Sequence, residues 1–259
     1  MTWTTQPRSE AGQLSAITAG DGQTVLLIHG VGLRAEAWGA QIAALAGFCR
    51  VQAVDMPGHG KSAALPSGAQ LADFTDVIAA AIKGPAVVIG HSFGAMIALD
   101  IAIRHPGKVK AVAALNAVHR RSAAAKAAVM RRAAMLDGVS AADPTATLDR
   151  WFGPVPSPER EACREWLCAV DPAGYRDAYR VFAAEDGPSD EGLHSLGCPA
   201  LFLTGADEPN STPAMSRRMA ALAPQGRAKI IPGAAHMLPM THAAKVSAIL
   251  EHFVKGHSE

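Results

Sequence analysis

The chain has 259 residues, of which 49% are hydrophobic and 18% are charged. This length allows one large domain or one core with a sizeable insertion, and the hydrophobic fraction excludes a disordered chain. Because the chain has 24 Lys and Arg residues and 23 Asp and Glu residues, the net charge is only +1. We therefore expect neither nucleic acid nor a membrane surface as a partner.

The start of the chain and its cysteines predict a soluble, cytoplasmic protein. Residues 1–8 lack the charged and then apolar layout of a signal peptide, and no apolar run is long enough for a membrane-spanning helix. Cys49, Cys163, Cys168 and Cys198 contain no Cys-x-x-Cys pair. We expect reduced thiols, with neither a zinc site nor a disulfide framework.

Short β-rich runs alternate with helical runs along most of the chain. Continuous apolar runs that end in turn residues are typical of buried parallel strands. Strands interleaved with helices indicate an α/β fold, in which helices cover both faces of a parallel sheet. Strands are expected at residues 25–28, 51–54, 86–89, 109–115, 200–204 and 228–231.

The segment 119–195 interrupts this alternation and predicts a helical cap. It contains no convincing strand, and we expect it to be inserted in a core made of residues 1–118 and 196–259. Its aromatic side chains can form an apolar ceiling over a site or pack the inserted helices together. Helices are expected at residues 121–136, 145–152, 158–170 and 173–184, and the aromatic residues are Trp151, Phe152, Trp166, Tyr175, Tyr179 and Phe182.

A glycine-flanked serine lies between an expected strand and an expected helix, in the sequence Gly90-His91-Ser92-Phe93-Gly94. The pattern Gly-x-Ser-x-Gly in this context is typical of a nucleophile elbow, a strained turn that lifts the serine oxygen above the sheet. The alternative is a serine in a glycine-rich turn with no catalytic role. The strand and helix on either side favour Ser92 as a nucleophile.

A serine hydroxyl needs a base that removes its proton. His236 follows the last expected strand, in a loop at the same carboxyl edge as Ser92, and is the expected base. His91 points away from the nucleophile in an elbow, while His29 and His59 lie in glycine turns, so we expect these three to hydrogen bond structurally. No two histidines have the spacing of a helical metal site, and we predict no metal.

The base in turn needs a carboxylate that fixes its tautomer and stabilises the imidazolium. Asp207 and Glu208 lie side by side after the expected strand at 200–204. Either residue gives the order serine, acid, histidine along the chain. Their own chemistry does not decide between them.

Five motifs in this order resemble the serine hydrolases of the α/β-hydrolase fold, over nearly the whole chain. The resemblance implies an α/β-hydrolase fold with an inserted cap and no cofactor. The motifs are His29-Gly30-Val31-Gly32, Asp55-Met56-Pro57-Gly58-His59-Gly60-Lys61-Ser62, Gly90 through Gly94, Gly205 through Pro213, and Gly233 through His236.

The resemblance also assigns further parts of the site. In this family the strand-end turn commonly reads Gly-x-x-Asp-Pro, which places Glu208 on the position of the catalytic acid, with glutamate replacing the commoner aspartate. The backbone N–H groups of Val31 and Phe93 are implied as the oxyanion hole, where losing one donor typically costs roughly 100- to 1,000-fold in rate. Asp55 lies in a turn that is structural in the family. We expect Met237 to line the pocket.

These residues predict a serine hydrolase that cleaves a small or medium carboxylic ester through an acyl-enzyme. Relatives that use aspartate at the elbow are dehalogenases and epoxide hydrolases, so Ser92 indicates acyl chemistry. A hydrolase of carbon–carbon bonds in a dienoic ring-fission product, or an enol-lactonase, is a close variant. We expect Trp151 to contact the small-molecule substrate, whereas Arg120 and Arg121 either contact an anionic group or are solvated.

A hydrolase-like ligand-binding protein without catalysis is the alternative from another class. Ser92, His236 and an adjacent acid are all present, which argues against it.

Overall fold

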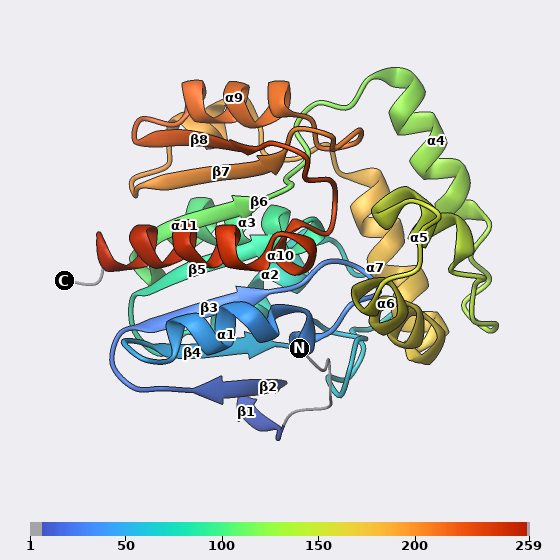
Figure 1. Cartoon of the computed structure of the whole chain (residues 1–259), viewed down its shortest axis with the longest axis horizontal. Helices are drawn as coiled ribbons and strands as arrows, with labels where there is room; N and C mark the ends of the chain where they lie inside the picture. Colours follow the sequence, from blue (N-terminus) through green and yellow to red (C-terminus); the bar gives the residue numbers. More distant parts are fainter. Residues whose placement is uncertain (1–6, 258–259) are drawn as a thin grey trace.

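An eight-stranded sheet with helices on both faces forms the body of the protein (Figure 1), in a computed structural model that describes residues 7–257. The strand order is β1-β2-β4-β3-β5-β6-β7-β8. The pairs β1–β2 and β2–β4 are antiparallel, and every other pair is parallel. This confirms the predicted α/β fold class. The strands are β1 (Ser9–Ala11), β2 (Leu14–Ala19), β3 (Thr24–Ile28), β4 (Arg50–Val54), β5 (Ala86–His91), β6 (Val109–Leu115), β7 (Ala200–Gly205) and β8 (Gly226–Ile231).

The described helices are all short. The longest, α7 and α11, have 13 residues each, whereas a membrane span needs roughly 20, so none of the described helices can cross a bilayer. The helices are η1 (Ala35–Trp38), α1 (Gly39–Leu45), α2 (Leu71–Ala80), α3 (Phe93–Arg104), η2 (Pro106–Lys108), α4 (Ala123–Ala134), α5 (Thr145–Phe152), α6 (Pro158–Ala169), α7 (Pro172–Ala184), α8 (Asp190–His194), α9 (Pro213–Leu222), α10 (Leu238–Thr241) and α11 (Ala243–Lys255).

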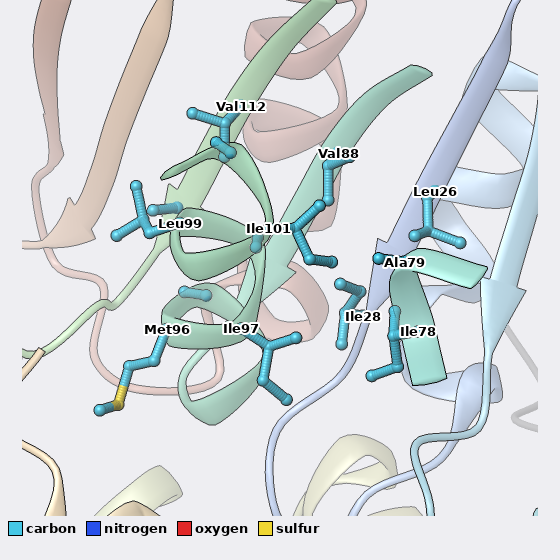
Figure 2. Close-up of a cluster of buried hydrophobic side chains, with 14 of the residues drawn as sticks. Leu26, Ile28, Ile78, Ala79, Val88, Met96, Ile97, Leu99, Ile101 and Val112 are labelled. Carbon is cyan, nitrogen blue, oxygen red and sulfur yellow. The ribbon is translucent and has the colours of Figure 1, made fainter. Parts of the chain in front are cut away.

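Both faces of the central strands are buried, which explains their continuous apolar runs. In β3, Val25 and Leu27 join the apolar cluster beneath α1 and α11, while Leu26 and Ile28 join the cluster beneath α2, α3 and α9. Figure 2 shows part of the second cluster, where Ile78 of α2 lies beside Ile28. Each such buried side chain stabilises the fold by about 1.5–3 kcal/mol.

The antiparallel hairpin β1–β2 and the short helix α8 are not predicted by the sequence. β2 pairs with β1 and β4, β1 forms one edge of the sheet, and β8 forms the other. β1 has only three residues, and neither β1 nor β2 contains a continuous apolar run that would predict a buried strand. The six parallel strands lie where the apolar runs predict them, with ends that differ by at most two residues.

The helices α4 to α7, which follow β6, lie beyond the carboxyl ends of the parallel strands (Figure 1). Gly174 of α7 meets the turn at Gly58 so closely that a methyl group on Gly174 would overlap the Gly58 carbonyl oxygen. α8 instead packs against α9. We propose that α4 to α7 form the cap predicted at residues 119–195, and that α8 returns the chain to the core.

Gly94 is a point where only a glycine fits between α3 and the sheet. A methyl group there would overlap the carbonyl oxygens of Ile28 and His29, which are backbone atoms of β3 and its following turn. We expect Gly94→Ala to cost about 1–3 kcal/mol, which lowers Tm by roughly 2–12 °C. Thermal unfolding measures this. Gly47→Ala, at an open position, is the matched control, and equal Tm values for the two variants would contradict the close packing.

Candidate active site

The turn between β5 and α3 holds Ser92 in a backbone conformation that residues with side chains rarely adopt. Its φ is 57° and its ψ is −118°, in a strained region that favours glycine. The Ser92 N–H donates to the carbonyl oxygen of Leu115 in β6 at 2.8 Å. A methyl group on Gly90 would overlap the Gly94 carbonyl, so the turn is as tight as the glycines allow. This is the geometry of a nucleophile elbow.

His236 and Glu208 form a buried pair beside this turn. His236 Nδ1 lies 2.9 Å from Glu208 Oε2, which leaves Nε2 as the nitrogen that can take up a proton. Glu208 Oε1 accepts hydrogen bonds from the backbone N–H groups of Asn210 at 2.7 Å and Ser211 at 3.2 Å. Glu208 is buried and Asp207 is exposed. The structure thus brings Glu208, not Asp207, to the histidine.

The environment of Glu208 favours its ionised form. Burial raises the pKa of this carboxyl, but attraction to His236 and hydrogen bonds from His236, Asn210 and Ser211 outweigh burial and lower the pKa from 4.5 to about 2. A carboxylate at neutral pH accepts a hydrogen bond from the Nδ1–H group and holds the imidazole in one orientation.

Asn116 and His91 hold the backbone of His236. Asn116 Nδ2 and His91 Nε2 each donate to the His236 carbonyl oxygen at 2.8 Å. Asn116 Nδ2 also lies 3.4 Å from Glu208 Oε2. The Asn116 backbone has a φ of 51°, a conformation that asparagine tolerates better than most residues. Asn116 therefore links the acid and the base, a role that no sequence motif signalled.

The His29–Gly32 turn lies against the elbow, at the place where an oxyanion hole would form. A methyl group on Gly30 would lie 3.1 Å from Ser92 Cβ. Within residues 7–257, the Val31 N–H makes no backbone hydrogen bond. Phe93 is the first residue of α3, so its N–H has no acceptor within the helix. Both predicted donors are thus next to Ser92 and available.

Buried histidines support this turn. The Gly32 N–H donates to His59 Nε2 at 2.9 Å, and the Met56 N–H donates to His29 Nε2 at 3.0 Å. Burial is the largest cause that lowers the pKa of His29 to about 4 and of His59 to about 3. Both rings are therefore neutral and accept hydrogen bonds from the backbone, as the sequence predicts.

A cavity of about 70 Å³ lies above Ser92 and His236 and beneath α4, α5 and α7. The Trp151 ring stacks on the His236 ring, with centroids 5.4 Å apart and an angle of 24° between the planes. A side chain of α5 therefore contacts the His236 ring directly. The cavity is lined by Val31, Ser92, Val118, Arg121, Ala125, Val129, Arg132, Thr147, Arg150, Trp151, Tyr175, Tyr179, Phe182, Asn210 and His236.

Arg132 and Arg150 place positive charge in the roof of this cavity. Arg132 Nε donates to Tyr179 Oη at 3.0 Å, and Arg150 donates to Thr147 Oγ1 at 3.3 Å. In the described part of the chain, neither guanidinium forms an ion pair with a carboxylate. Burial and then repulsion from Arg132 lower the pKa of Arg150. Two arginines without a counter-ion are suited to bind an anion.

The remaining predicted side chains lie in different places. Arg121 lines the cavity, bonded to the carbonyl oxygens of Phe182 and Glu185, whereas Arg120 is 59% exposed and pairs with Asp190. Met237 is 1% exposed and packs in the cluster of Leu33, Leu148 and Leu167. It lies outside the cavity lining, because the first turn of α10 directs it into the base of the cap.

Other expected features are structural in this chain. Asp55 accepts hydrogen bonds from the Ala35 and Lys61 N–H groups and pairs with Arg8. Phe152 and Trp166 pack in the base of the cap, away from the cavity. Residues 7–257 contain no cluster of three or more histidine, cysteine or acidic side chains that would hold a metal. Arg132, Arg150, Asn116 and Asn210 were not found from the sequence, because isolated residues on helices and loops carry no motif.

The lowered Glu208 pKa predicts a pH-dependent contribution to stability. Because the folded-state pKa of about 2 lies below the ordinary 4.5, this contribution is complete above pH 4.5 and is lost as pH falls toward 2. Between pH 7 and pH 3 the loss is about 2 kcal/mol. Urea unfolding at both pH values measures this loss as a difference in unfolding free energy. We expect Glu208→Gln to make that difference smaller by the same amount. Asp207→Asn is the control, and the prediction fails if both variants keep the wild-type difference.

Similarity to known proteins extends over most of the chain. Residues 25–249 match the model of the alpha/beta hydrolase family. Over 238 residues, 90% of each chain, the protein is 40% identical to the (E)-2-((N-methylformamido)methylene)succinate hydrolase of Acinetobacter baylyi. Over 250 residues, 91% of this chain and 96% of the relative, it is 31% identical to the pimeloyl-acyl-carrier-protein methyl ester esterase of Chromobacterium violaceum.

A solved structure of a thermophilic esterase from Thermogutta terrifontis, with malate bound, superposes with a TM-score of 0.80 at 24% identity. The superposition covers 98% of this chain and 100% of the esterase chain. The matched model and the two curated relatives confirm the resemblance seen in the five motifs, and those relatives are hydrolases. The chain therefore belongs to the alpha/beta hydrolase family.

Proposed function

We propose that this protein is a serine hydrolase that cleaves an acyl bond through Ser92, His236 and Glu208. His236 Nε2 takes the proton of the Ser92 hydroxyl while the Ser92 oxygen attacks the substrate carbonyl carbon. The imidazolium then gives this proton to the leaving group as its bond to carbon breaks. Water, deprotonated by the same nitrogen, attacks the acyl-enzyme, and the proton returns to Ser92 when the acid product leaves.

The neighbouring groups support each charge that this reaction develops. The Val31 and Phe93 N–H groups face the carbonyl oxygen as it becomes an oxyanion. Glu208, ionised and 2% exposed, stabilises the imidazolium. The Trp151 face against His236 limits the orientations of the ring and shields it from water.

The proposed substrate class rests on one observation. Arg132 and Arg150 lie over Ser92, and neither forms an ion pair with a carboxylate of the described residues. A guanidinium in a site of low polarity binds carboxylates strongly. We therefore propose a small acyl substrate with one or two carboxylates. The Acinetobacter baylyi relative is named for a succinate derivative with an N-acyl group, which agrees with this class.

The bond that is cleaved follows from the same site. The ester that the sequence predicts and an acyl–nitrogen bond both present a carbonyl group to Ser92. One curated relative is named for an N-acyl compound and the other for a methyl ester. We propose hydrolysis of an N-acyl or O-acyl dicarboxylate. A small molecule is the proposed partner, and a cytoplasmic location stays a prediction from the sequence.

The triad predicts reaction with a fluorophosphonate probe, which labels activated serines. We expect labelling of the wild-type protein and none of Ser92→Ala, because no other oxygen is activated at this site. Glu208→Gln should slow labelling by at least about tenfold through loss of the imidazolium partner, whereas Asp207→Asn, which changes an exposed neighbour, should not. Mass spectrometry of labelled peptides identifies the site. Folded wild-type protein that stays unlabelled would exclude the proposed mechanism.

The arginine pair predicts a preference for anionic substrates. We expect a 2-(acylaminomethylene)succinate to be hydrolysed much faster than its dimethyl ester. Replacing one charge-assisted contact by Arg150→Leu should lower kcat/KM for the dianion by about 10- to 100-fold and leave the dimethyl ester unchanged. Arg131→Leu, at an exposed position beside Arg132, is the control.

Steady-state kinetics on both substrates measures this preference. An equal loss on the charged and the neutral substrate would show that Arg150 has a structural role only. The analogue with oxygen in place of nitrogen, tested in parallel, compares the ester with the acyl–nitrogen bond.

A further inference from the structure

A second chamber of about 300 Å³ lies within the cap, next to the cavity over Ser92. Its walls come from the end of α4, the loop 135–144, and the parts of α5, α6 and α7 that face this loop. Figure 1 shows α4, α5, α6 and α7 together on the right-hand side, beyond the carboxyl ends of the parallel strands. Met135, at the outer wall, is 83% exposed, so the chamber opens toward solvent on that side.

The chamber and the active-site cavity share part of their lining. Arg132 bonded to Tyr179, and Arg150 bonded to Thr147, face both spaces. A carboxylate held by these two arginines is therefore at the boundary, with Ser92 on one side and the chamber on the other. The residues that line both spaces are Arg132, Thr147, Arg150, Tyr175 and Tyr179.

The sizes of the two spaces indicate that a ligand uses both. Pockets for small organic ligands are typically about 300–1,000 Å³. The cavity over Ser92, at about 70 Å³, is well below this range. The chamber, at about 300 Å³, reaches this range and shares lining residues with the cavity over Ser92.

The chamber's lining selects an apolar group. Leu136, Leu167 and Val170 face it, together with Met135. Asp143 is its one acidic side chain among the described residues, and that carboxylate accepts hydrogen bonds from the Thr145 N–H and hydroxyl at 3.0 and 2.7 Å. An uncharged hydrocarbon group can therefore transfer from water into the chamber without breaking the hydrogen bonds of Asp143.

We infer that the chamber is a second substrate subsite, which takes an alkyl or aryl substituent on the carbon next to the carboxylate held by Arg132 and Arg150. This inference rests on the proposed function for the position of the carboxylate. It extends the substrate class from small dicarboxylates to dicarboxylates with an apolar side chain. Each methylene buried in the chamber should strengthen binding by roughly three- to fourfold.

The test is calorimetric binding of 2-alkylsuccinates to the full chain, with methyl, propyl and pentyl side chains, and of succinate itself. For the wild-type protein we expect affinity to rise roughly three- to fourfold per methylene. Val170→Phe fills the chamber and should abolish this rise while leaving succinate affinity unchanged. Leu136→Ala enlarges the chamber and should extend the rise to longer chains. Ala169→Phe, which adds the same ring at an exposed neighbouring position, should behave as wild type.

The outcomes separate the subsite from the proposed function. Affinity that stays flat or falls with chain length in the wild type, or a rise that Val170→Phe leaves intact, would overturn the subsite. Fluorophosphonate labelling of Ser92 in each variant verifies that the fold is retained. If succinate does not bind while long-chain succinates do, the anion site fails and the apolar subsite stands.

Discussion

The close approach of backbone to backbone around Ser92 is the constraint on which the site depends. Gly94 lies against the carbonyl oxygens at the end of β3, and Gly90 lies against the Gly94 carbonyl. This contact fixes the first turn of α3 onto the sheet, which holds the Phe93 N–H beside the turn that carries Val31. Any larger side chain at these glycines would move Ser92 and the Phe93 N–H together, so under the proposed function the same packing serves stability and catalysis.

Neutral imidazoles hold the loops around Ser92. His29 and His59 accept from backbone N–H groups, and His91 donates to the His236 carbonyl. Burial lowers the pKa of His91 to about 3, as it does for the other two, so these rings stay uncharged at neutral pH. A ring with one donor and one acceptor can connect two loops without placing a net charge in the core. The three rings thus add no charge beside Glu208 and the arginines of the roof.

The parallel strands, four inserted helices and the elbow could be predicted from the sequence because each has a local cause. Apolar runs mark strands buried on both faces, and Gly90 and Gly94 mark a turn that few other residues permit. Glu208 was chosen over Asp207 only through family resemblance, since adjacent acids look alike until the turn directs one inward. Arg132 and Arg150 could not be predicted, because their convergence depends on how α4 and α5 pack. Met237, expected at the pocket, is turned into the cap base by α10.

The contact between Gly174 and Gly58 anchors α7 on the backbone of the core. α7 cannot shift there without disturbing the turn that holds His59, whose ring accepts a hydrogen bond from the Gly32 N–H. Arg132 of α4 is bonded to Tyr179 of α7, whereas Arg150 and Trp151 belong to α5. Under the proposed function, substitution of Arg132 or Arg150 would alter which molecule is recognised, whereas substitution of Trp151, which stacks on His236, would also affect the reaction itself.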